Sequence, residues 1–514
     1  MVKFSRFRAR PNVRSALKTI GKPVSRTHEG AHAYRRDPKS ELFLLAVTNM
    51  VAEPTFYEGG GRRDRRFADL VHRVTREDPE WMQRFVPWLR AEANMRSAAT
   101  VAAAEYVKAG GPHGRKVIAS AVARADEPAE ILAYWSQEHG RRFPQPVKRG
   151  VADAVRRHYT EYSALKYDGL SRAWRMGDVI ELTHPKPAQA WQSDLFRYLL
   201  DRRHHPEAVV LPEALSKVAR RAELEAVPVE HRRGMLRERG ADLLEEAGAT
   251  WEWLSGWLPG GMDAEAWEAV IPSMGYMALL RNLRNFDEAD ISHQRVRYVQ
   301  GVLVDPERVA GSRQFPYRFW SAYRNVPSLR WASTLETALE LSVRNIPALP
   351  GRTLVLTDTS GSMTMPVSGR SKVRHFEVAA LFAAALAAQA DEVDLVSFAE
   401  GSEKIRFRKH QSVLRTIDKV ESRIGMVGHA TFLGAAVGRR FDGHDRVVVF
   451  SDMQTHDQLP PLDGVSVFVF NTGGYQATPF AVGDKGHYEI GGFTDATFRL
   501  MKHLEDLQEA DWPF

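Results

Sequence analysis

The chain has 514 residues, of which 44% are hydrophobic and 26% charged, with a net charge of +7 and no cysteine. This composition is typical of a folded globular protein and excludes collagen-like, coiled-coil and wholly disordered chains. The lack of cysteine excludes disulfides, thiolate–zinc sites, iron–sulfur clusters and a cysteine nucleophile.

The positive charge is concentrated in the front part of the chain. Residues 1–26 hold eight basic and no acidic side chains. From residue 351 onward there are 17 basic and 21 acidic residues, which leaves 54 basic and 43 acidic residues before that point. A basic front part indicates a polyanionic partner such as nucleic acid. We expect residues 1–40 to form a basic arm with little regular structure.

Targeting signals and membrane segments are not evident in the sequence. The first residues contain no apolar signal-peptide core, and the apolar runs are too short to span a bilayer. We therefore expect a cytoplasmic protein that makes no membrane contact.

From about residue 41 to residue 345 the pattern is helical. Trp81, Phe85 and Trp88 recur at the spacing of one helix face, and residues 118–125 show a similar periodicity. Glycines and prolines separate the helical segments. One such stretch, GGGRRDRR at 59–66, predicts a flexible basic loop. Many short helices joined by tight breaks predict an α-solenoid of stacked helix pairs.

The pattern changes near Pro350. Four short apolar runs predict strands that are buried on both faces of a parallel sheet. They cover 352–358, 393–398, 446–452 and 465–471. Predicted helices cover 373–390, 431–440 and 494–508. Alternating strands and helices predict an open α/β sheet with a site at the carboxyl ends of its strands.

Oxygen-bearing side chains gather where this site should lie. Asp358, Ser360 and Ser362 follow the first strand, Thr431 precedes a helix, and Asp452 follows a later strand. Hard oxygen donors favour Mg²⁺, with Ca²⁺ and Mn²⁺ as other candidates. We expect the three hydroxyls to bind the metal directly, and the two aspartates to hold its water ligands. The alternative is that the Asp-x-Ser-x-Ser sequence is only a turn.

Two resemblances follow from these residues. The DTSGSM motif at 358–363, Thr431 and Ser451–Asp452 resemble the metal-ion-dependent adhesion site of a von Willebrand factor A domain. The upstream part resembles the TROVE module of the Ro autoantigen family, which includes bacterial Ro-related proteins. The segments that carry this second resemblance are 51–58, 178–187, 277–286, 315–324 and 341–358.

The resemblance implies a fold with two parts. They are an α-helical HEAT-like solenoid closed into a ring and a C-terminal α/β Rossmann-like von Willebrand factor A domain. The expected divisions are an arm over 1–40, the TROVE module over 41–345 and the A domain over 346–514. The resemblance also implies a monomeric ring, and binding through the metal rather than catalysis by it.

The family further implies a function in RNA quality control or decay, as a scaffold or chaperone. Its members bind small Y-type RNAs on the outer surface and single-stranded ends of misfolded RNAs in the central hole, and an exoribonuclease is a partner to consider. Lys166 and His184 match the family's lysine and histidine contacts for Y RNA. Leu170 stands where the family has an arginine, so we expect Arg172 or Arg175 to substitute for it.

The same stretch is a candidate RNA surface without the resemblance. Cations that can bind phosphates alternate with aromatic side chains that can stack on bases. The candidate RNA-binding residues are Lys148, Arg149, Lys166, Arg172, Arg175, His184 and Lys186. The aromatic residues are Tyr159, Tyr162, Tyr167 and Trp174. Alternatively, the aromatic residues belong to the core and the cations to a solvated face.

Two classes of function remain open. The sequence has neither a P-loop nor a His-Glu-x-x-His zinc motif, so we expect no enzyme activity. The first hypothesis is an RNA-binding scaffold. The alternative is a protein–protein adaptor that binds acidic partners through the metal site.

Overall fold

The computed structural model describes residues 16–48, 55–326, 328–344, 348–367, 371–406, 411–460, 462, 464–483, 486–491, 501 and 512–514. The chain divides into two compact units. Unit 1 comprises Met1–Asp78, Arg313–Ser321 and Leu335–Phe514. Unit 2 comprises Pro79–Ser312 and Ala322–Thr334. This division differs from the boundaries expected after residues 40 and 345, because residues 41–78 pack with the C-terminal part of the chain.

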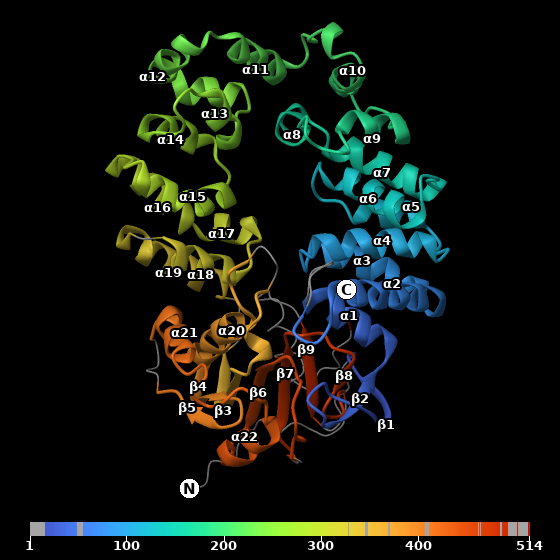
Figure 1. Ribbon diagram of the computed structural model, residues 1–514, viewed down its shortest axis with the longest axis vertical. Coiled ribbons are helices and arrows are strands. Elements are labelled where there is room, and N and C mark those ends of the chain that lie inside the picture. The colour runs from blue at the N-terminus through green and yellow to red at the C-terminus, as the bar shows by residue number, and fades with distance from the viewer. Residues whose placement is uncertain are drawn as a thin grey trace. The chain divides into compact units, whose positions relative to one another are not determined.

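A six-stranded sheet forms the centre of unit 1, in the order β5-β4-β3-β6-β7-β9 (Figure 1). Its strands are β3 (Leu349–Asp358), β4 (Ala390–Phe398), β5 (Ser402–Lys404), β6 (Arg446–Ser451), β7 (Ser466–Asn471) and β9 (His487–Gly491). All neighbouring pairs are parallel except β4 and β5. The four predicted strands are confirmed, whereas β5 and β9 were not predicted.

Helices cover both faces of this sheet (Figure 1). They are α20 (His375–Gln389) and α22 (Leu433–Arg440), and α21 (Val413–Glu421) packs on α20. On one face, Leu354 and Val449 pack with Leu433 and Val437 of α22 in a buried apolar cluster. The other face contacts α20, whose alanines allow a close approach to β3 and β6. Burial on both faces explains why the strands lack polar alternation. Of the predicted helices, 373–390 and 431–440 are confirmed, whereas 494–508 lies almost wholly outside the described residues.

The chain's first described residues are part of unit 1 and have regular structure. β1 (Thr19–Arg26) and β2 (His32–Arg36) form an antiparallel hairpin, and β2 pairs with β8 (Ala477–Thr478). The expectation of an irregular arm over 1–40 is therefore wrong for residues 19–36. The reason is that the basic side chains of β1 point to solvent while its backbone pairs in a sheet.

Two helices complete this region, α1 (Pro38–Thr48) and α2 (Gly60–Glu77). The flexible basic loop predicted at 59–66 is wrong, because residues from Gly60 onward are helical. Arg63 and Arg66 are not solvated there. Both pair with Glu58, at 2.9 and 2.8 Å. Neutralisation by this nearby carboxylate allows the basic sequence to start a helix against the core.

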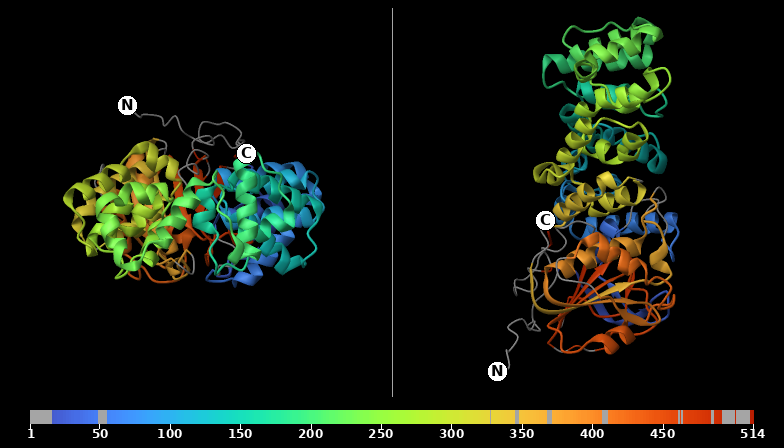
Figure 2. Two further views of the ribbon diagram at one scale, coloured as in Figure 1. Left: turned by 90° about the horizontal axis from the view of Figure 1, so that it is seen from above. Right: turned by 90° about the vertical axis from the view of Figure 1, so that its left-hand side faces the viewer.

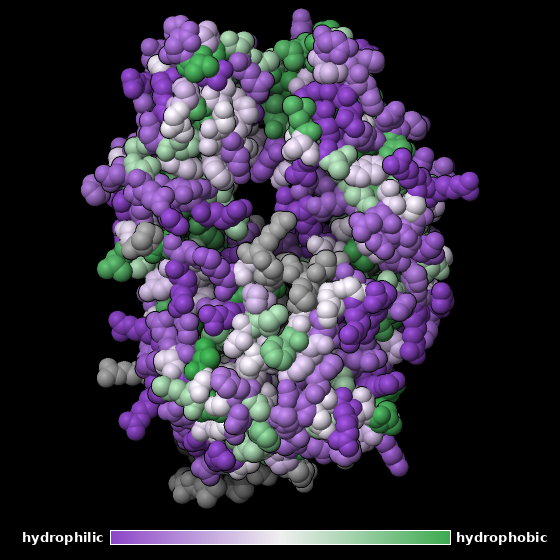
Figure 3. All heavy atoms as spheres, viewed as in Figure 1, coloured by the Kyte–Doolittle hydropathy of each residue, from purple (hydrophilic) through white to green (hydrophobic). Residues whose placement is uncertain are grey.

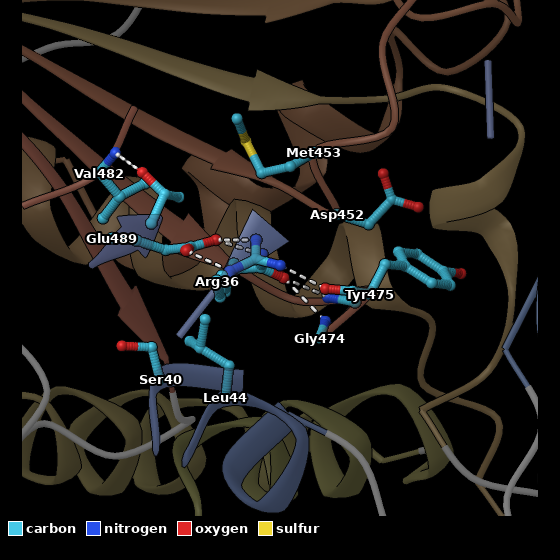
Figure 4. A network of polar contacts seen from close by, with 12 residues as sticks. Arg36, Ser40, Leu44, Asp452, Met453, Gly474, Tyr475, Val482 and Glu489 are labelled. Atoms are coloured by element: carbon cyan, nitrogen blue, oxygen red, sulfur yellow. Dashed lines mark hydrogen bonds and ion pairs between the residues drawn. The ribbon is translucent and has the colours of Figure 1, made fainter. Parts of the chain in front are cut away.

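A buried ion pair joins the N-terminal hairpin to the main sheet. The Arg36 guanidinium makes two hydrogen bonds of 2.6 Å to the Glu489 carboxylate of β9 and also donates to the Tyr475 carbonyl (Figure 4). The two side chains are 1% and 0% exposed. Asn471 Nδ2 donates to Glu489 at 2.6 Å, and its Oδ1 accepts from the Gly474 amide at 2.8 Å. Every charge in this network therefore has a partner.

Unit 2 is helical throughout its described residues. Its helices are α3 (Pro79–Ala91), α4 (Arg96–Lys108), α5 (Gly114–Ser120), α6 (Glu127–His139), α7 (Gln145–His158), α8 (Glu161–Tyr167), α9 (Met176–Thr183), α10 (Ala190–His204), α11 (Ser216–Ala226), α12 (Val229–Glu246), α13 (Trp251–Trp257), α14 (Ala264–Val270), α15 (Tyr276–Glu288), α16 (His293–Leu303) and α17 (Pro306–Ser312). Two further helices, α18 (Pro316–Asn325) and α19 (Ala332–Ser342), have residues in both units. The helices lie in successive layers (Figure 2).

The predicted helix faces hold in part. Trp81 and Phe85 are buried on α3, as their spacing predicts. The periodicity at 118–125 is misleading, because α5 ends at Ser120 and the later apolar residues are buried from the following loop.

Hydrophilic residues predominate on the face shown in Figure 3, and hydrophobic residues lie in scattered groups. Among the described residues, no helix is both long and apolar enough to cross a membrane.

The ion pair at Arg36 gives a first prediction. Arg36→Met leaves Glu489 charged and buried, so it should lower the free energy of opening β2 and β9 by about 3–5 kcal/mol. Adding Glu489→Gln removes that charge and should recover part of the loss. Hydrogen exchange of the β2 and β9 amides in the full chain measures both. Arg73→Met, which breaks an exposed pair on α2, is the control and should cost less than about 0.5 kcal/mol. Equal losses in the single and double variants would contradict this account.

Candidate metal centre and nucleic-acid interface

Three loops meet at the carboxyl edge of the main sheet. The loop after β3 is held to the segment before α22, because the Gly361 amide donates to the His429 carbonyl at 2.9 Å. The loop after β6 is held to the same segment, because the His456 amide donates to the Thr431 carbonyl at 2.8 Å. Backbone hydrogen bonds thus bring together the three segments that carry the predicted metal ligands.

All five predicted ligands are buried in this edge: Asp358, Ser360, Ser362, Thr431 and Asp452. Ser360 Oγ lies 3.3 Å from Ser362 Oγ. The Asp358 carboxylate accepts from the Ser360 amide at 2.9 Å and from Ser451 Oγ at 2.5 Å. These hydrogen bonds fix the Asp358 carboxylate beside the serines, where it would hold a water ligand of a bound metal.

The two aspartates lie in an unfavourable electrostatic environment. Burial raises the pKa of Asp358 above its usual range. Burial, and then repulsion by Asp358, raise the pKa of Asp452. Hydrogen bonds from Ser362 and from the Gln454 amide oppose this rise at Asp452. Two buried carboxylates that repel each other are stabilised by a cation between them.

The donor set fits a hard divalent cation. Its donors are hydroxyl and carboxylate oxygens, which Mg²⁺ and Ca²⁺ prefer. Within the described ranges, no three His, Asp or Glu side chains are grouped closely enough to hold a metal by themselves. A metal at this edge would therefore need the hydroxyls of Ser360, Ser362 and Thr431 as ligands.

The predicted RNA-binding residues lie on consecutive helices of unit 2. Lys148 and Arg149 are in the first turns of α7, Lys166 is near the end of α8, and His184 directly follows α9. Lys166, Arg172, His184, Lys186 and Arg149 are exposed, and Lys148 is half-buried. His184 ends α9 in a left-handed conformation at φ 47° and ψ 57°.

Arg175 is the exception among these residues. It is 4% exposed, and its guanidinium pairs with Asp168 at 2.7 Å. Asp168 also pairs with Arg202 at 3.0 Å and accepts from the Met176 amide at 2.9 Å. The expectation that Arg175 supplies a guanidinium to RNA is therefore corrected: it holds the start of α9 in place. Arg172 is exposed and stays a candidate.

The aromatic residues divide between the core and the surface. Tyr159 is 1% exposed, so it is a core residue and not a stacking platform. Tyr162 and Tyr167 flank the Lys166 ammonium, whose nitrogen lies 5.5 and 5.4 Å from their ring centroids. Trp174 packs edge-on against Phe143 with a centroid distance of 6.2 Å.

A basic groove on α5 and α7 was not predicted as a site. It encloses about 520 Å³ and is lined by Lys116, Arg156, Arg157, Asp153 and neighbouring small residues, including Ala188. Gln192 connects the chain after His184 to the end of α7. Its side chain accepts from the Ala188 amide at 2.7 Å and donates to the Arg156 carbonyl at 3.0 Å. Lys116 is 40 residues from Arg156 in sequence, so only the α5–α7 packing reveals the groove.

Comparisons with known proteins agree with the fold. Residues 246–337 match the family model of the TROVE domain. The crystal structure of the Ro (RSR) protein of Deinococcus radiodurans matches with a TM-score of 0.58 and 19% identity, over 91% of this chain and 99% of that one. No curated protein sequence matches. The resemblance to Ro-related proteins is thereby confirmed. The TROVE match lies outside residues 148–186, so the RNA-binding residues named above are not tested by it.

The metal edge gives a second prediction, for the chain kept metal-free with EDTA. The pKa of Asp452 is raised in the folded state, so the folded chain holds this proton more tightly than the unfolded chain. Ionisation of Asp452 as pH rises therefore destabilises the fold. Asp452→Asn should therefore stabilise β3 and β6 against local opening more at pH 8 than at pH 4.5. The difference should be about 1 kcal/mol or more, since one pKa unit corresponds to about 1.4 kcal/mol. Hydrogen exchange at both pH values measures it, and a pH-independent effect would contradict the assignment.

Proposed function

We propose that this Ro-related chain is an RNA-binding protein. It would bind small Y-type RNAs on the surface of its helical unit and single-stranded ends of misfolded RNA, as a scaffold or chaperone in RNA quality control or decay. The observation that carries the proposal is the set of exposed cations on α5, α7 and α8 and in the loops before and after α9, since such cations bind phosphates by releasing counterions.

The groove on α5 and α7 supplies the phosphate contacts of this proposal. Lys116, Arg156 and Arg157 line it, and its single carboxylate, Asp153, pairs with Arg115 at 2.6 Å. That pairing leaves the net charge of the groove positive. A guanidinium can donate to two phosphate oxygens at once. The arginines of the groove can therefore bind an RNA backbone in a defined geometry.

Lys166 supplies a second kind of contact. The tyrosine rings beside it offer faces for an unpaired base, and its ammonium can reach the adjoining phosphate. His184 and Lys186 lie on the exposed loop that follows α9. We propose that these residues and Arg172 bind the structured small RNA. No step of this function requires catalysis, and an exoribonuclease would be the partner that degrades the bound RNA.

The oxygen-lined edge of the main sheet favours a second candidate function. We propose that unit 1 has a von Willebrand factor A fold and that Ser360, Ser362 and Thr431 would hold Mg²⁺ or another hard divalent cation. Such a cation would supply a position for a carboxylate of an acidic partner protein. The chain would then be an adaptor as well as an RNA-binding protein.

The RNA proposal gives a third prediction. The triple variant Lys116→Ala, Arg156→Ala and Arg157→Ala should weaken RNA binding and make its logarithmic salt dependence shallower by about 2–3 units, roughly one per lost phosphate contact. Filter binding across a salt series measures both quantities. The control removes three exposed cations elsewhere in unit 2: Arg84, Lys108 and Arg297. Equal losses in the two variants would indicate nonspecific attraction only.

The metal proposal gives a fourth prediction. Ser360→Ala with Ser362→Ala should abolish Mg²⁺ binding in calorimetric titration while the circular dichroism spectrum and RNA affinity stay unchanged. Ser422→Ala, at an exposed serine of the same unit, is the matched control. Undiminished Mg²⁺ affinity in the double variant would refute this ligand set.

A further inference from the structure

The turn of the N-terminal hairpin is attached to the loop that carries Asp452. Thr27 Oγ1 donates to the Thr455 carbonyl at 2.7 Å. The His28 amide donates to Gln454 Oε1, also at 2.7 Å. Both acceptors lie within three residues of Asp452, so the next residue of the turn, Glu29, is brought to the candidate metal centre.

Two side chains fix the Glu29 carboxylate at this place. One oxygen accepts from the Tyr57 hydroxyl, and the other pairs with His456 Nε2 at 2.6 Å. The Glu29 side chain is 22% exposed. Its negative charge contributes to the raised pKa of both Asp358 and Asp452. Glu29 is therefore held beside the loop that carries Asp452.

Tyr57 links Glu29 to a predicted metal ligand. Its hydroxyl donates to Glu29, and burial raises its pKa while a hydrogen bond with Ser362 opposes that rise. Its ring stacks on His28 with a centroid distance of 4.9 Å and an interplanar angle of 3°. It also meets the Tyr475 ring edge-on at 5.6 Å. These contacts pack the Tyr57 ring against the hairpin turn and against Tyr475.

We propose that Glu29 is the chain's own carboxylate for the metal centre. It would complete the metal's coordination from within the chain, at the place where an acidic residue of a partner would otherwise bind. The inference rests on the proposed metal site. It implies that an acidic partner must displace the hairpin turn before it can bind the metal. The carboxylate is already ordered by Tyr57 and His456, so it competes without a further loss of side-chain entropy.

The test uses Mn²⁺ as the probe and the full chain with Glu29→Gln. Loss of this charged oxygen ligand should weaken Mn²⁺ binding about tenfold or more. The water-proton relaxation rate produced by bound Mn²⁺ should rise, because water takes the vacated position. Tyr57→Phe, which removes only the hydroxyl that holds Glu29, should change both quantities in the same direction by less. Glu392→Gln, at an exposed position on β4 of the same unit, is the matched control and should change neither.

Sodium acetate gives an independent readout. It should restore Mn²⁺ affinity in Glu29→Gln. It should have little effect on the unchanged chain, in which Glu29 already occupies that ligand position. If Mn²⁺ binds the unchanged chain and depends on Ser360 and Ser362, but Glu29→Gln and Glu392→Gln behave alike, the inference about Glu29 is wrong and the metal site stands. An equal effect of acetate on both proteins also overturns it. If Mn²⁺ binding does not depend on the two serines, the metal site itself is refuted.

Discussion

The pairing of Arg36 with Glu489 is the constraint on which the arrangement of unit 1 depends. Two charges are held out of water, and their mutual hydrogen bonds together with those of Asn471 and the Tyr475 carbonyl satisfy them. Such a pair contributes little net stability compared with apolar packing, but it strongly disfavours other registers, because a shifted strand would leave one charge buried alone. It fixes where β2 lies, and thereby where the preceding hairpin turn meets the loop after β6.

Most strands of the C-terminal sheet could be predicted because the residues that identify each strand are adjacent in the sequence. Runs of branched residues buried on both faces identify β3, β4, β6 and β7, and the polar residues that follow them identify one edge of the sheet. The five candidate metal ligands were chosen from that logic, and all five are buried. Glu29 could not be found in this way, because its place is set by contacts with residues more than 400 positions away.

Charge alone misled the interpretation of several arginines. Arg63, Arg66 and Arg175 come from basic stretches, yet each is paired with a carboxylate inside the fold. The sequence gives the charge of a guanidinium but does not show which carboxylate it pairs with. Asp168, the partner of Arg175, has no sequence feature that distinguishes it from other aspartates. The basic groove shows the opposite case. Lys116 is unremarkable in sequence and becomes part of a cationic surface only because α5 packs on α7.

The β2–β8 pairing has a consequence for the order in which the chain folds. Tyr34 of β2 pairs with Thr478, and Arg36 pairs with Glu489, so the hairpin's partners are synthesised more than 400 residues after it. At ribosomal rates of about 5–20 residues per second, the hairpin would wait roughly 20–90 s after its own synthesis. During that time unit 2 can fold, since its two segments both leave the ribosome earlier. Unit 1 thus completes its sheets only after the residues of unit 2 have been synthesised.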